Sequence, residues 1–200
     1  PLRRQRQMCI RDRYNTNLKI GINISPKQID NINFASKFLS YIDRYGIDPS
    51  CVDVEITEAS LVNAEEMMQS VLSELSNRGI CISIDDFGTK YSTFSYLKEL
   101  PVDKIKIDMN FIHGIGKSRI DEAIILSLIS LSKELNIEIV AEGVETEEQL
   151  NFLTANGCNM IQGFYFFSAL PVETVESEFG GESIINSHNI FELKQRDLKI

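Results

Sequence analysis

Polar side chains recur at one place in this sequence, the carboxyl end of each apolar strand-like run. They are Asn23, Glu55, Asp85, Asp86, Lys106, Asp108, Glu142 and Gln162. A single acid or amide at a strand end is most often a cap of the following helix. Six successive runs with the same arrangement favour a shared site, because the carboxyl ends of the strands in a parallel barrel meet at one mouth, where ligands bind.

The residue types at this mouth indicate a particular chemistry. Several carboxylates in one place repel each other at neutral pH unless cations lie among them. Oxygen ligands without His or Cys favour Mg²⁺ or Mn²⁺. A lysine beside them can bind an anionic substrate or hold a water molecule. A phosphate ester is the substrate most consistent with the pattern, since metals neutralise phosphate oxygens and activate water.

The elements that must position these residues are strands and helices in alternation. Period-two alternation of apolar and polar residues is clearest at 51–57, where Val52, Val54 and Ile56 point one way. Strands are predicted at residues 18–25, 51–57, 80–84, 102–108, 137–141 and 159–167. Helices are predicted at residues 26–45, 63–78, 92–100, 121–135, 147–156 and 172–179.

This order predicts the fold class α/β, with a parallel sheet and right-handed crossovers. A complete (β/α)₈ barrel takes ~250 residues. The chain therefore reads as a partial TIM-type (β/α) barrel of about six βα units. An open doubly wound sheet is the alternative. The fingerprints GxGxxG and GxxxxGK[ST] are absent from the sequence, which argues against a nucleotide-binding doubly wound fold.

The composition of the chain argues against several classes of protein. With 200 residues, 29 acids and 20 bases, the net charge is −9, which argues against a broad surface for DNA or RNA. The apolar runs are too short to span a bilayer. Four cysteines without a CxxC pair, and only two histidines, argue against structural zinc. Cys51 and Cys81 lie in apolar runs, which predicts buried reduced thiols and a cytoplasmic location.

The first thirteen residues differ from the rest. They contain five arginines and one acid, whereas the other 187 residues contain 15 bases and 28 acids, a net of −13. A basic arm, the end of an amphipathic helix, and a stretch of non-native sequence are the three interpretations. The predicted organisation is a basic segment at 1–13, a domain at 14–179 and a polar tail at 180–200.

Six short runs, in order, resemble the EAL domain family. They are NISP from Asn23, EITE from Glu55, DDFGT from Asp85, KID from Lys106, AEGVE from Ala141, and QG from Gln162. Each run alone is a weak signal, but the ordered set, over about residues 18–171, is specific. The resemblance implies a modified TIM-type barrel that hydrolyses the bacterial second messenger cyclic di-GMP to linear pGpG with Mg²⁺ or Mn²⁺.

The resemblance also implies roles for individual residues. Asn23, Glu55 and Asp85 would ligate a first metal ion. Asp85 and Asp86 would ligate a second, with Asp85 as the bridge. Lys106 would contact the attacking water or the scissile phosphate.

Four further acids and an amide complete the implied site. Glu142 would be the general base or a carboxylate near the metals. Asp108 and Gln162 would complete the site, and Glu58 and Glu145 would hold the loop that follows Asp86.

Two departures from the family pattern stand out. The Glu-Ala-Leu signature and the arginine shortly after it belong to a first strand that would precede residue 1. The chain is therefore expected to be a fragment of a longer protein that is weak or inactive alone. Lys90 also stands where the family has glycine, in the loop after Asp86, which would cost ~1 kcal/mol or more if that position needs a positive φ.

Alternatives remain at this point. A catalytically silent EAL domain would sense cyclic di-GMP or dock a partner protein. A metal-dependent lyase or enolase-like barrel is disfavoured because the motifs match another chemistry. A homodimer, and GGDEF or sensor domains in a parent protein that is itself cytoplasmic or membrane-anchored, are the partners that the family resemblance suggests.

Overall fold

The computed structural model describes residues 19–29, 31–61, 66–89 and 97–168. Residues Lys19–Tyr165 form one compact unit that contains every strand and helix given below. The predicted boundaries at 13 and 179, the helix at 172–179 and the tail from 180 lie outside the described residues. Within the described ranges, no helix combines the length and the apolar character needed to cross a membrane.

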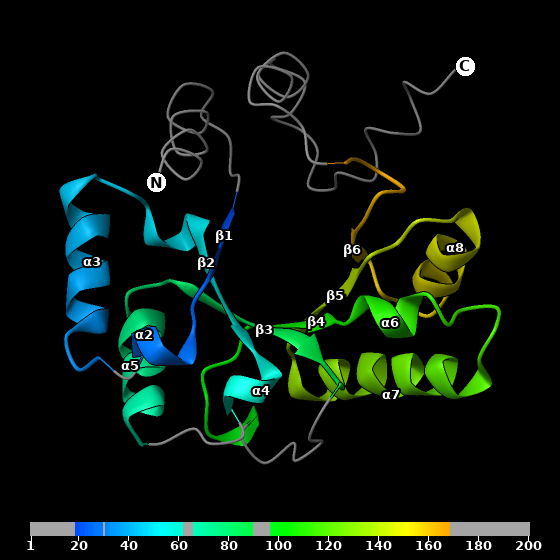
Figure 1. The fold of residues 1–200 in the computed structure, drawn as a ribbon, viewed down its shortest axis with the longest axis horizontal. Helices are drawn as coiled ribbons and strands as arrows, with labels where there is room; N and C mark the ends of the chain where they lie inside the picture. Colours follow the sequence, from blue (N-terminus) through cyan, green and yellow to red (C-terminus); the bar gives the residue numbers. More distant parts are fainter. Residues whose placement is uncertain (1–18, 30, 62–65, 90–96, 169–200) are drawn as a thin grey trace. The chain divides into compact units, whose positions relative to one another are not determined.

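A six-stranded parallel sheet forms the centre of this unit, with the strands side by side in chain order (Figure 1). The strands are β1 (Ile20–Asn23), β2 (Val52–Thr57), β3 (Cys81–Phe87), β4 (Lys104–Ile107), β5 (Glu138–Glu142) and β6 (Met160–Gln162). The prediction of a parallel α/β sheet is confirmed. Because neighbouring strands are successive in sequence, each connection crosses over to the adjacent strand, as in a barrel.

Helices cover one face of the sheet. They are α2 (Pro26–Ile29), α3 (Phe34–Arg44), α4 (Glu58–Leu61), α5 (Glu66–Asn77), α6 (Met109–Ile112), α7 (Arg119–Leu135) and α8 (Glu147–Ala155), with a 3₁₀ turn η1 at Pro49–Cys51. In Figure 1, α3 and α5 lie together on one flank of the sheet and α7 and α8 on the other. Leu72 and Leu75 of α5 and Ile125 of α7 are fully buried, which stabilises the packing of helices on strands.

The two faces of each central strand differ in polarity. Val54 and Ile56 of β2 are fully buried, whereas Asp53 and Glu55 make polar contacts with Ser83 of β3 and Lys106 of β4. Since successive side chains alternate between faces, the apolar set packs against the helices and the polar set faces the inside of the curved sheet. The alternation predicted for residues 51–57 is thus confirmed.

The predicted helix at 26–45 is wrong in one respect, because two helices, α2 and α3, stand in its place. The side-chain oxygen of Asn31 accepts a hydrogen bond from the backbone N–H of Asn33 at 3.0 Å. Such local side-chain bonds compete with helical backbone bonds and favour a turn. The described residues Asn31–Asn33 therefore form a turn before α3.

Two other predicted elements differ from the structure. The last predicted strand, 159–167, is reduced to β6, because the chain turns at Gly163. A Cβ atom there would collide with the backbone of Val144, which comes within 2.7 Å at its carbonyl carbon. Most of the helix predicted at 92–100 lies outside the described residues. Within its described part, residues 97–98 form a 3₁₀ turn.

Candidate active site

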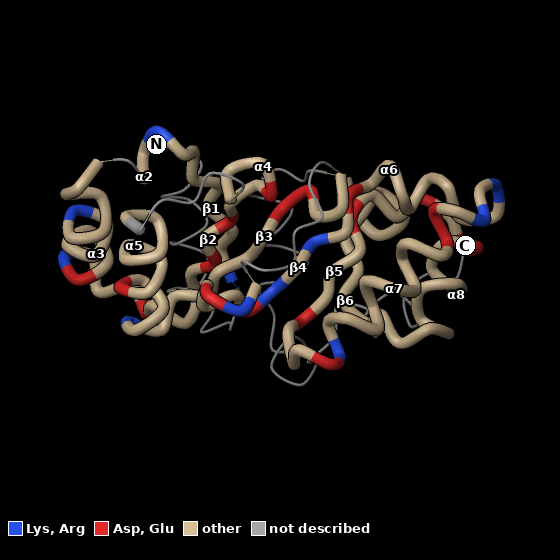
Figure 2. Tube along the Cα trace, turned by 90° about the horizontal axis from the view of Figure 1, so that it is seen from below, with Lys and Arg blue, Asp and Glu red and all other residues tan. Residues whose placement is uncertain are grey.

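The ammonium group of Lys106 is surrounded by carboxylates from three other strands. Its Nζ lies 2.5 Å from Oε1 of Glu142, 3.2 Å from Oε1 of Glu55 and 3.5 Å from Oδ1 of Asp85. These four side chains, here called the Lys106 cluster, come from β2, β3, β4 and β5. Four of the predicted site residues are therefore in one place, at the carboxyl ends of adjacent strands. Figure 2 shows the acidic stretches of β2 and β3 beside the basic stretch of β4.

A bulge in β3 brings two successive acids to this edge. The strand continues through Phe87 rather than ending at Ile84 as predicted, and its pairing with β4 shifts between Ile84 and Phe87. Asp86 has a φ of 55°, in the left-handed region that Asp tolerates better than most residues. The shift breaks the alternation of faces, so Asp85 reaches Lys106 while Asp86 lies near Asp108.

Asp86 and Asp108 add negative charge beside the Lys106 cluster. Burial raises the pKa of Asp86 above its usual range, and the charges of Asp85 and Asp108 raise it further. Asp108 is buried and begins α6 by accepting hydrogen bonds from the backbone N–H and side-chain amide of Asn110 at 2.7 and 2.6 Å. Three carboxylates therefore contact the Lys106 ammonium, and two more lie beside them.

The protonation of Lys106 and Glu142 follows from this imbalance. Burial lowers the pKa of Lys106, but the hydrogen bond and charge of Glu142 and the charges of Glu55 and Asp85 raise it more, so the pKa lies above its ordinary value. Burial raises the pKa of Glu142, and Asp85 and Glu55 add to this against the opposing effect of Lys106. The charged form of Lys106 is thus favoured, while Glu142 has a strengthened affinity for a proton.

The backbone directly after Glu142 requires glycine. Gly143 has a φ of 72°, and a Cβ atom at this position would lie 2.6 Å from Cβ of Met109. Both the dihedral and the close approach require glycine. Glycine at 143 therefore allows the end of β5 to lie directly against α6.

Glu58 anchors the loop that follows Asp86. Its side chain is almost fully buried, and its Oε2 accepts hydrogen bonds from the backbone N–H groups of Gly88 at 2.9 Å and Thr89 at 3.2 Å. A buried carboxylate that receives two backbone N–H groups fixes the position of the backbone that donates them. The start of the loop, next to Asp86, is thereby held against α4.

The other predicted residues have looser places. Asn23 is the register partner of Glu55 on the neighbouring strand, and Gln162 is the partner of Glu142. Both are exposed at the same edge of the sheet. Oε1 of Glu145 lies 3.9 Å from Nε2 of His113. Among the described residues, no hydrogen bond or ion pair joins Glu145 to the loop after Asp86. Residues 90–96 of that loop lie outside the described ranges.

A second polar cluster, which sequence reasoning missed, lies deeper inside the sheet. Asp53 accepts a hydrogen bond from Ser83 Oγ at 2.5 Å and pairs with Lys104 Nζ at 2.6 Å. These three residues, here called the Lys104 cluster, are buried. Each stands two residues before a member of the Lys106 cluster on the same strand, so both sets face the same way. That spacing was the available signal.

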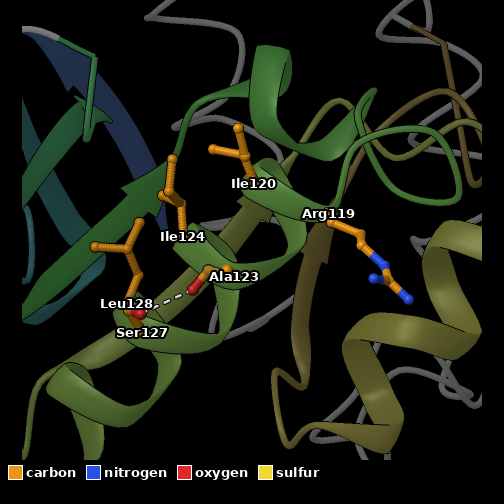
Figure 3. A pocket seen from close by; sticks show the side chains of 6 residues that line it. All are labelled: Arg119, Ile120, Ala123, Ile124, Ser127 and Leu128. Carbon is orange, nitrogen blue, oxygen red and sulfur yellow. Dashed lines mark hydrogen bonds between the residues drawn. The ribbon is translucent and has the colours of Figure 1, made fainter.

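One cavity lies away from both clusters. It has a volume of about 380 Å³ and is lined by residues of α7 alone: Arg119, Ile120, Ala123, Ile124, Ser127 and Leu128. In Figure 3 the side chain of Arg119 points away from those of Ile120, Ile124 and Leu128, and the Ser127 hydroxyl donates a hydrogen bond to the carbonyl of Ala123. The lining is mostly apolar and has no carboxylate, so it shares nothing with the chemistry of the Lys106 cluster.

A parallel α/β sheet with acids and a lysine at its carboxyl edge defines a barrel protein with its site at the mouth. The sequence model of the EAL domain matches residues 2–169, and the chain belongs to this family. MucR of Pseudomonas aeruginosa, a bifunctional diguanylate cyclase/cyclic di-GMP phosphodiesterase, is 40% identical over 154 residues, which are 77% of this chain and 22% of MucR. The chain thus spans about a fifth of the length of that curated relative.

Solved structures agree with this family and with its fold. The PaMucR phosphodiesterase in complex with c-di-GMP matches with a TM-score of 0.75 and 39% identity, covering 78% of this chain and 64% of that one. BlrP1 of Klebsiella pneumoniae, in a complex with manganese and cy-diGMP, matches with a TM-score of 0.68 and 32% identity, covering 73% and 38%. The prediction of a partial TIM-type barrel is confirmed.

The donor set at the mouth fits a divalent cation of the kind bound by BlrP1. The amide of Asn23 and the carboxylates of Glu55, Asp85 and Asp86 are hard oxygen ligands on three adjacent strands. The excess of carboxylates over ammonium groups, and the raised pKa of Asp86, favour an added positive charge. Across the described ranges, no three His, Cys, Asp or Glu side chains are gathered as ligands of one ion.

Proposed function

We propose that this chain is part of a divalent-metal-dependent phosphodiesterase that hydrolyses one phosphodiester bond of cyclic di-GMP and yields linear pGpG, and that the 200 residues by themselves are weakly active or inactive. The observation that carries the proposal is the Lys106 cluster, a lysine ammonium held among three carboxylates at the mouth of an EAL-family barrel. The names of the relatives support the substrate, because MucR is a cyclic di-GMP phosphodiesterase and its solved structure holds c-di-GMP.

Lys106 and Glu142 would act on the reacting atoms. The ammonium of Lys106 stays charged, so it can donate hydrogen bonds to a phosphate oxygen and help neutralise the charge that develops there. The raised pKa of Glu142 suits a group that accepts a proton from the attacking water. In this arrangement Lys106 would orient the phosphate, and Glu142, whose Oε1 lies 2.5 Å from Nζ of Lys106, would receive the proton.

The acids of β2 and β3 would hold the cations. Asn23, Glu55, Asp85 and Asp86 are the proposed ligands, with Asp85 shared between two ions. When bound, the ions would supply charge neutralisation at the phosphate and a lower pKa for water. Glu58 would keep Asp86 in place by holding the N–H groups of Gly88 and Thr89.

The test is hydrolysis of cyclic di-GMP in Mn²⁺ by the chain extended with a Glu-Ala-Leu strand before residue 1, with pGpG separated by chromatography. Asp85→Asn is nearly isosteric but removes the shared charge, so turnover should fall about 10³-fold or more, several kcal/mol of barrier. Glu138→Gln is the matched control, because Glu138 is an exposed acid at the other end of β5 and should leave turnover unchanged.

Metal binding gives a second readout of the same proposal. Mn²⁺ at 100 times its Kd should stabilise the unaltered chain by about 2.7 kcal/mol, by mass action, and Asp85→Asn by clearly less. Equal stabilisation of both proteins would remove Asp85 from the metal site. Binding of cyclic di-GMP without any hydrolysis by the chain extended with the Glu-Ala-Leu strand would replace the proposed enzyme by a silent sensing domain.

A further inference from the structure

The Lys104 cluster lies one step below the proposed metal ligands, on the same strands. Asp53, Ser83 and Lys104 precede Glu55, Asp85 and Lys106 by two residues each. Two residues of parallel strand are ~6.6 Å. The inside of the sheet therefore contains two lysines, of which one belongs to the site and the other lies just beneath it.

The partners of Lys104 keep its charge out of the site. Its side chain is 7% exposed and that of Asp53 is 8% exposed, with Nζ 2.6 Å from Oδ2. The other oxygen of Asp53 accepts the Ser83 hydroxyl at 2.5 Å. Both carboxylate oxygens are thus used within the cluster, and the one acid balances the one ammonium.

The region above has the opposite balance. In the Lys106 cluster one ammonium is shared by three carboxylates. A buried ammonium without a partner is costly, and lysine has a flexible four-carbon stem. After Asp53, the other acid that acts on Lys104 is Glu138, its register partner on β5, which is exposed to solvent. If Asp53 lost its charge, the excess of negative charge on the inner face of the sheet would be that of Glu55 and Asp85, which are the proposed metal ligands.

We propose that Asp53 is a positioning residue for the metal site: it holds the ammonium of Lys104 beneath the site, so that this cation does not compete with a divalent metal for the carboxylates of β2 and β3. The inference rests on the proposed function, since it takes those carboxylates to be metal ligands. It assigns to the Lys104 cluster a role in metal affinity and not only in stability.

The experiment is calorimetric titration of Mn²⁺ alone into the full chain and its variants. Asp53→Asn should weaken Mn²⁺ binding about 10–100-fold, the usual range for residues that orient ligands. Lys104→Met should bind Mn²⁺ at least as tightly as the unaltered chain, because it removes the competing cation. The double variant Asp53→Asn/Lys104→Met should regain the original affinity.

The asymmetry between the single variants separates this role from a structural one. If the cluster only supported the fold, Asp53→Asn and Lys104→Met would weaken Mn²⁺ binding alike, and that result would overturn the inference. Unchanged binding in Asp53→Asn would overturn it as well. If Asp53→Asn does not fold, the other two variants decide, and a loss of tenfold or more in either one contradicts the inference.

The outcome for the unaltered chain distinguishes the two proposals. If the unaltered chain binds no Mn²⁺, the metal-dependent function fails together with this inference. If it binds Mn²⁺ and the variants do not show the asymmetry, only the role of Asp53 fails.

Discussion

The Lys104 and Lys106 clusters use similar residues on the same strands, yet they differ in charge balance. Lys104 pairs with one acid, Asp53, whose other carboxylate oxygen accepts a hydrogen bond from the Ser83 hydroxyl. Both carboxylate oxygens of Asp53 therefore have a partner. Lys106 has three acids around one ammonium, with two more acids beside them. A balanced buried network needs nothing further, whereas an excess of carboxylates attracts cations. The two clusters are therefore distinguished by their charge balance more than by their burial: the Lys104 cluster is neutral, and the Lys106 cluster has an excess of negative charge.

Breaking the balanced cluster should give the largest effect on stability. Lys104→Met leaves Asp53 charged and without its ammonium in a buried place, so unfolding free energy should fall by about 3–5 kcal/mol, as measured by urea denaturation. The double variant Asp53→Asn/Lys104→Met removes both charges and should recover most of that loss. If the double variant is no more stable than the single one, the pair is not a closed unit.

Removing the other lysine should act on turnover. Lys106→Met takes away the proposed donor to the phosphate, so kcat for cyclic di-GMP should fall about 10²–10³-fold, or roughly 3–4 kcal/mol. Lys133→Met, at the exposed end of α7, is the control with the same change of charge. A decrease of less than about threefold in kcat would show that Lys106 balances charge without touching the reaction.

The smallest effect tests the charge excess itself. The pKa of Asp86 is raised in the folded chain, so its ionised form costs stability at neutral pH, and that cost is lost as pH falls through the folded pKa. Without metal, Asp86→Asn should therefore stabilise the chain at pH 7 by roughly 0.5 kcal/mol or less, since the side chain is exposed and screened.

The pH dependence of this gain is the decisive measurement. It should fade as the pH falls through the raised pKa of folded Asp86 and be lost below the ordinary Asp pKa of about 3.9, where Asp86 is neutral in both the folded and the unfolded chain. Thermal melts in a chelator at several pH values follow it. Asp53→Asn, in the balanced cluster, should destabilise at neutral pH, and a gain there instead would erase the contrast between the two clusters.

Local patterns in the sequence were sufficient to predict the parallel sheet and the place of the site. Period-two alternation in Val52–Thr57 is a property of neighbouring residues, and it correctly separated the helix-facing side from the inner side. Polar residues at strand ends follow from the direction of parallel strands. These inferences depend only on the spacing of residues along the sequence. The sequence alone therefore places Glu55, Asp85, Lys106 and Glu142 at one mouth.

Only the tertiary structure decided which of these polar residues touch. The bulge at Asp85–Asp86 depends on the register between β3 and β4, which no local pattern determines. Lys104 and Lys106 have the same residue type and face the same way, so the sequence could not say that one is balanced by Asp53 and the other shared among three acids. The members of each cluster come from strands that are tens of residues apart in sequence, and they meet only in the folded, curved sheet. The charge balance of the Lys104 cluster and of the Lys106 cluster is therefore decided by the tertiary structure.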